Sequence, residues 1–95
     1  MDAKETYERK VEAELKKLDA QIDLAKAKAE SATADAQIEY EERVEQLRDR
    51  REEVEKRYKA LKVSGAQAWR ELQGGVDTAL KELDNAVSRA LAEFG

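Results

Sequence analysis

Residues 26–37 read KAKAESATADAQ, and this stretch decides whether the first two thirds of the chain form one helix or two. Around it, apolar residues recur in alternating steps of four and three, which is the heptad spacing of a coiled coil. The positions with this spacing, called the seam below, are Val11, Leu15, Leu18, Ile22, Ala25, Ala29, Ala32 and Ala36. Within the quoted stretch the seam is made of alanine alone, so it allows close helix approach but contributes little burial.

Two structures are compatible with this stretch. The seam passes through it without a slip, and it contains neither glycine nor proline, which favours one straight helix over residues 3–62. In the alternative, Ser31, Thr33 or Asp35 caps a new helix after a turn near 31–35, and three segments of about 30 residues each form a three-helix bundle. The straight helix is the leading prediction, with a length of about 90 Å at 1.5 Å per residue.

The ends of the predicted helix carry recognisable signals. Asp2 followed by Glu5 is an acidic variant of the capping box, which favours a helix start at residue 3. Ser64 and Gly65 interrupt the pattern, and this predicts a tight reversal at 63–66 followed by a second helix over about 66–94. The leading prediction is therefore an all-α helical hairpin forming one domain, 1–95.

A hairpin of such unequal arms leaves half of the long seam uncovered, and self-association would bury it. We therefore expect a homo-oligomer, with an antiparallel dimer favoured. The expected interface is Tyr7, Val11, Leu15, Leu18, Ile22, Ala25, Ala29, Ala32 and Ala36. At the reversal, an aromatic and aliphatic clamp is expected to hold the two helices together, made of Tyr58, Leu61, Trp69 and Leu72.

Three features within the helices have alternative interpretations. Arg51 continues the four-and-three spacing between Leu47 and Val54, and an ion-paired arginine that fixes the register is favoured there over a phosphate contact. The tyrosines at 7, 40 and 58 are interpreted as residues at the edge of the core. Gly74 and Gly75 lie inside the second helix and predict either a kink or close helix approach, or a hinge that releases residues 76–94.

Composition argues against several functional classes. The 95 residues include no histidine and no cysteine, so the usual general bases, thiolate nucleophiles and transition-metal ligands are missing, and we expect neither an enzyme nor a cofactor. Acidic and basic residues are interspersed with a net charge of -4, which disfavours nucleic acid. No stretch resembles a signal peptide or membrane span, and a cytoplasmic location is expected.

The whole chain resembles small bacterial coiled-coil stress-response proteins of the type found in cyanobacteria. The resemblance is carried by the start Asp2-Ala3-Lys4-Glu5-Thr6-Tyr7, by ADAQIEYEERVEQLRDRREE at 34–53 and by SGAQAWRELQGGVDTAL at 64–80. It implies a stress-associated protein that acts through contacts with itself or with other proteins, and it implies no catalytic residues.

The end of the chain, residues 69–94, also resembles the amphipathic ends of phasins, which coat polyester storage granules. Only 8 of the 40 charged residues lie in 64–95. The alternative function is therefore binding to a membrane or granule surface through residues 76–94, although a long hydrophobic region typical of phasins is missing.

Overall fold

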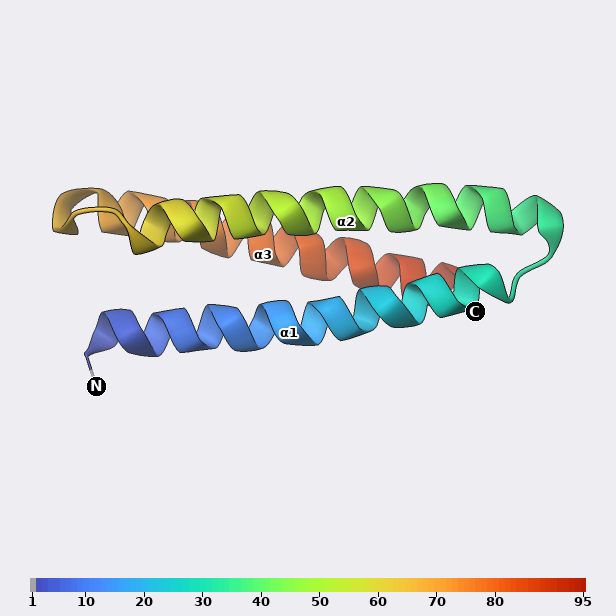
Figure 1. Cartoon of the computed structure of the whole chain (residues 1–95), viewed down its shortest axis with the longest axis horizontal. Coiled ribbons are helices and arrows are strands. Elements are labelled where there is room, and N and C mark those ends of the chain that lie inside the picture. The colour runs from blue at the N-terminus through green and yellow to red at the C-terminus, as the bar shows by residue number, and fades with distance from the viewer. Residues whose placement is uncertain (1) are drawn as a thin grey trace.

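The computed structural model describes residues 2–95 and consists of three helices, of which the first and third run in one direction and the second in the opposite direction (Figure 1). They are α1 (Ala3–Glu30), α2 (Ala34–Lys62) and α3 (Ala66–Glu93). The all-α prediction is confirmed. The hairpin with a single helix over 3–62 is wrong, and the three-helix alternative with a turn near 31–35 fits the structure. The bundle measures 50 × 20 × 16 Å, about half the length that the straight helix requires.

The turn between α1 and α2 occupies residues 31–33, at the centre of the alanine-rich stretch. Ser31 ends α1, and its hydroxyl donates to the carbonyl of Ala27 at 3.1 Å. Thr33 is the N-cap of α2 in an extended conformation, without a side-chain cap bond. The break lets α1 and α2 pack against each other, so the apolar faces of both helices are buried within one chain.

The other predicted boundaries are confirmed. The carboxylate of Asp2 accepts a 2.8 Å hydrogen bond from the backbone N–H of Glu5 at the start of α1. At the second turn, residues 63–65, the hydroxyl of Ser64 donates to the carbonyl of Leu61 at 2.8 Å. Gly65 is the N-cap of α3. Because α1 and α3 both start at this end of the bundle, the N-terminal region lies beside the second turn (Figure 1).

The core is a single cluster of buried apolar side chains drawn from all three helices. Its members are Val11, Leu15, Leu18, Ile22, Ala25, Ala29, Val44, Leu47, Val54, Tyr58, Leu61, Val76, Ala79, Leu83, Val87 and Ala90. Four of these residues are alanines, and two of them, Ala25 and Ala29, lie near the end of α1. Their small side chains allow this part of α1 to approach its neighbours closely.

Most residues of the expected dimer interface are buried in the core of the single chain. Six of its nine residues, from Val11 to Ala29, are buried in this cluster. Tyr7 is half-buried and packs against the cluster, Ala32 lies in the turn, and Ala36 is half-buried in the first turn of α2. The seam that was expected to lie open on a long helix is therefore covered by α2 and α3 of the same chain.

Helix α3 runs without interruption through Gly74 and Gly75. A Cβ atom built on Gly74 would meet nothing within 4 Å, and one on Gly75 would lie 3.7 Å from Nη1 of Arg57, an ordinary contact. The pair is therefore not required by a close helix approach, contrary to that interpretation. Within residues 2–95, no helix combines the length and apolar character needed to cross a membrane.

Candidate functional site

Each of the three tyrosines joins a different pair of helices. Tyr7 on α1 donates to Oδ1 of Asp77 on α3 at 2.6 Å, and Tyr58 on α2 donates to the carbonyl of Glu8 on α1 at 3.2 Å. Tyr40 on α2 donates to the carbonyl of Glu93 on α3 at 3.4 Å, and its ring stacks on Phe94 with a centroid separation of 4.1 Å. The tyrosines therefore connect the helices of the bundle.

These surroundings favour the neutral phenols. Burial, followed by the charges of Glu12 and Glu8, raises the pKa of Tyr58 to about 12. Burial and the hydrogen bond to Asp77 raise the pKa of Tyr7 well above its usual value. Since an ionised phenolate would be buried next to carboxylates, both residues are donors at neutral pH.

Arg51 is ion-paired, as the sequence indicated. Its Nε and Nη2 donate to the two carboxylate oxygens of Asp19 on α1, at 2.8 and 3.0 Å, and its Nη1 contacts Glu55 one turn further along α2. The hydrogen bond to Asp19 is the main cause that raises the pKa of Arg51. This planar bidentate pair fixes the register of α1 against α2. The guanidinium is therefore occupied by Asp19 and Glu55.

The four residues of the expected clamp all belong to the core or pack on it. Tyr58 and Leu61 are buried, and Trp69 and Leu72 are half-buried against the cluster. The ring of Trp69 meets Tyr7 edge to face, with centroids 5.4 Å apart and an interplanar angle of 72°. The tryptophan therefore ties the start of α3 to α1, a helix that the hairpin prediction did not place there.

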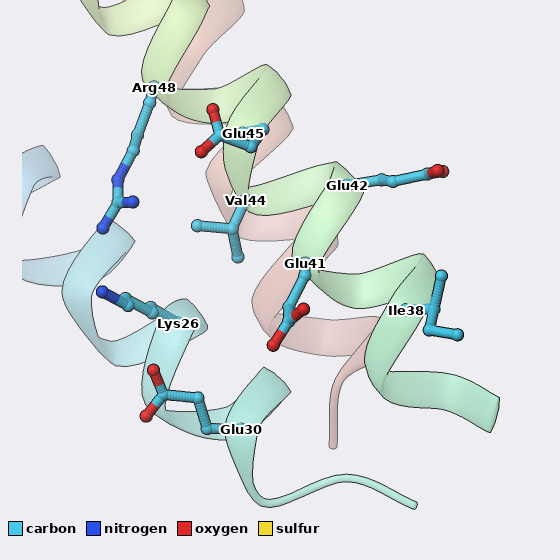
Figure 2. Close-up of a pocket in the computed structure, with 8 residues that line it drawn as sticks. All are labelled: Lys26, Glu30, Ile38, Glu41, Glu42, Val44, Glu45 and Arg48. Carbon is cyan, nitrogen blue, oxygen red and sulfur yellow. The ribbon is translucent and has the colours of Figure 1, made fainter. Parts of the chain in front are cut away.

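An open hollow of about 480 Å³ lies between α1 and α2, close to the first turn. We call it the α1–α2 hollow, and Figure 2 shows its lining: Lys26, Glu30, Ile38, Glu41, Glu42, Val44, Glu45 and Arg48. Val44 is a core residue at its base. Ile38 is 68% exposed and, with Glu42, extends on the side of α2 that faces away from α1. A large apolar side chain thus stands in water among charges.

The carboxylates of the hollow differ from those in the rest of the α1–α2 contact. Further along this contact, Asp19 and Glu55 pair with Arg51, and Glu12 lies 4.0 Å from Lys62. In the part of the chain that the structure describes, no ion pair involves Glu30, Glu42 or Glu45. Negative charge around Ile38 is therefore left available to cations from outside the chain.

Sequence reasoning did not single out Ile38 as a site residue. Heptad spacing identifies the core face, and Ile38 lies two residues after Ala36 and two before Tyr40, on another face of the helix. The signal that finds it is a large apolar residue at a position outside the seam, surrounded in sequence by glutamates. Such residues are the informative exceptions on a charged helix surface.

The hollow offers hydrophobic contact and charge, and these are the means of molecular association. Within residues 2–95, no group of three or more carboxylate, imidazole or thiol side chains is arranged to hold a metal ion. No known family, curated protein or solved structure matches the chain.

Proposed function

We propose that the chain is a non-enzymatic structural and interaction protein, associated with stress tolerance, which acts through protein contacts at the α1–α2 hollow. The exposure of Ile38 carries the proposal. An isoleucine of which 68% is in contact with water loses most of the stabilisation that its burial would provide, about 1.5 to 3 kcal/mol for a side chain of this size. A partner that covers it recovers this free energy.

The surroundings of Ile38 support protein binding. An apolar centre with a charged rim is the arrangement found in protein interfaces, where the centre supplies affinity and the rim supplies specificity. Glu42 and Glu45 provide the charged rim beside Ile38 on α2. The association with stress rests on the resemblance of the whole chain to bacterial stress-response coiled coils.

A complementation experiment tests this function. A strain without the gene is exposed to heat, salt and oxidants, and is supplied with the wild type, Ile38→Asp or Leu24→Asp. Leu24 is the matched control, because it is 49% exposed and lies on α1 outside the hollow. We expect the wild type and Leu24→Asp to restore survival and Ile38→Asp to fail. Equal survival of all three strains would contradict a role for the hollow.

Binding to a membrane or granule surface through residues 76–94 is the second candidate, supported by the apolar stripe and low charge of α3. Val76, Leu83 and Val87 are fully buried, so α3 would have to separate from α1 and α2 before it could bind. Flotation with vesicles and with polyester granules, followed by Trp69 fluorescence, tests the candidate. Unchanged sedimentation and emission in the presence of both surfaces would contradict it.

A further inference from the structure

The outward face of α2 carries a second regular pattern that the core does not use. Starting from Ile38, exposed residues follow one another in alternating steps of four and three. This outer stripe consists of Ile38, Glu42, Glu45, Asp49, Glu52, Lys56, Lys59 and Val63, and all eight are exposed. From Val44 to Leu61 the core face of α2 has the same spacing when the ion-paired Arg51 is counted, so over this part of the helix the stripe keeps a constant angle to the core.

The outer stripe is complementary to its own reverse. Ile38 and Val63 are equally far from the midpoint between Arg50 and Arg51, as are Glu42 and Lys59, and Glu45 and Lys56. Its charged residues are acidic from Glu42 to Glu52 and basic at Lys56 and Lys59, and an exposed aliphatic residue lies at each end. Ile38 and Val63, 68% and 86% exposed, are two of the three large apolar residues that the described chain exposes.

We propose that a second copy of this chain binds the outer stripe, with the two α2 helices antiparallel about a two-fold axis at residues 50–51. The proposal rests on the interaction function proposed above and names the partner. Each copy places Ile38 against Val63 of the other, Glu42 against Lys59 and Glu45 against Lys56. Because the two-fold axis repeats every contact, the dimer has four ion pairs and two aliphatic contacts. The interface is closed, so no further copy can add to it.

The charges of the stripe are free to form these pairs. Glu42, Glu45 and Lys56 have no ion pair within residues 2–95, and Lys59 has a single one, at 3.5 Å to Glu55, with 74% of its side chain exposed. Ile38 and Glu42 extend away from α1, so the first helix does not cover them (Figure 2). The stripe spans about 38 Å at 1.5 Å per residue, most of the length of the bundle.

Charge also selects the orientation. In a parallel pair in register, every residue of the stripe meets its own copy, so all charges along the stripe meet like charges. In the antiparallel pair the like contacts are confined to the centre, where Asp49 faces Glu52. The antiparallel pair is therefore the favoured one, and its affinity depends on salt.

Charge reversal tests the interface by sedimentation equilibrium. We expect a dimer for the wild type in low salt and at least a tenfold larger dissociation constant for E42K/E45K and for K56E/K59E, because each variant places like charges opposite each other. A mixture of the two variants restores all four ion pairs and should form a heterodimer. The control E71K/E82K changes exposed residues of α3 by the same charge and should remain a dimer, with helix content checked by circular dichroism.

Cysteine cross-linking tests the orientation, since the chain has no cysteine of its own. Under mild oxidation, a mixture of Ile38→Cys and Val63→Cys should form disulfide-linked dimers, whereas each variant alone should not. Cross-linking of Ile38→Cys alone would overturn the antiparallel arrangement. A wild type that stays monomeric in low salt at high micromolar concentration, or charge variants that dimerise as well as the wild type, would overturn the proposal.

These outcomes are separate from those of the proposed function. A monomeric wild type whose rescue of stressed cells still depends on Ile38 would reject the second copy as partner and leave the interaction function standing. A dimer whose disruption by E42K/E45K leaves survival unchanged would support the interface and contradict its part in the proposed function.

Discussion

Arg51 on α2 and Asp19 on α1 form a planar pair with two hydrogen bonds, at 2.8 and 3.0 Å, although 32 residues separate them in the sequence. The pair sits where a seam residue of α2 would otherwise be apolar, and Arg51 reaches out of the core to the rim of the α1–α2 contact. Its side chain is 25% exposed and that of Asp19 is 46% exposed, so solvent screens part of the attraction.

We expect Asp19→Ala to lower the free energy of unfolding by about 1 kcal/mol, because Arg51 keeps Glu55 but loses its bidentate partner. Urea unfolding at low and high salt measures the change, which should shrink as salt increases. Asp23→Ala is the control, since Asp23 is an exposed aspartate of the same helix without an ion pair among the described residues. An equal loss in both variants would show that the pair adds no stability.

Alkaline pH should destabilise the bundle through its tyrosines. The folded state raises the pKa of Tyr58 from 10.0 to about 12, so the unfolded chain loses its phenolic proton first as the pH rises. The stability contributed by the neutral phenol is complete below pH 10 and is lost between pH 10 and 12, at a cost of about 2 kcal/mol.

Tyr58→Phe removes this titration, so we expect its unfolding free energy to fall less steeply over the same range. Tyrosinate absorbance in the folded and unfolded chain gives the two pKa values directly. Tyr40→Phe is the control, because it leaves in place Tyr7 and Tyr58, the two tyrosines whose pKa values burial raises. A Tyr58 that titrates near pH 10 in the folded protein would contradict the prediction.

Gly74→Ala should stabilise the protein by about 0.5 to 1 kcal/mol, because glycine loses more backbone entropy in a helix than alanine does. The added methyl group meets nothing within 4 Å. Thermal unfolding measures the change. If the glycine pair is a hinge, the same variant should also bind vesicles or granules less well than the wild type, whereas unchanged binding would argue against the hinge.

Small-angle scattering should distinguish the folded-back chain from a rod. For the monomer, which E42K/E45K is expected to favour, we expect a longest dimension close to the 50 Å extent of the bundle. A longest dimension of about 90 Å would require an unbroken helix over 3–62. Limited proteolysis provides a second measurement, because cleavage should occur in the turns at 31–33 and 63–65.

The sequence predicted the all-α class, the helix start after Asp2, the reversal at Ser64, and the buried face of α1 from Val11 to Ala29. The straight helix was preferred over a turn near 31–35 because Ser31–Thr33 contains neither glycine nor proline, and because the seam continues through these residues in register. After Ala36 the spacing changes, because Tyr40 and Val44 follow at two successive steps of four residues, and this departure from the alternation is the trace of the break. Once α2 has an axis of its own, the phase of its core positions is independent of that of α1.

The candidate site was harder to predict than the core. Helical periodicity finds residues that face the interior, so it assigned Val11 to Ala29 to a dimer interface when the partner surface was in fact α2 and α3 of the same chain. Whether a seam is covered within one chain or between two depends on a turn of three residues, and the contacts are otherwise alike. Ile38 lies outside the heptad positions, so a search for the core face passes over it, and its exposure was established by the structure.

Three helices place the start of α1 and the end of α3 at opposite ends of the bundle (Figure 1). A force applied through the two ends of the chain would act along the bundle axis and slide α1 against α3. The contacts between these parallel helices, among them Tyr7 with Asp77 and Tyr7 with Trp69, would then be loaded together and not opened one after another. The rate of unfolding under such a force would therefore depend on the contacts between α1 and α3.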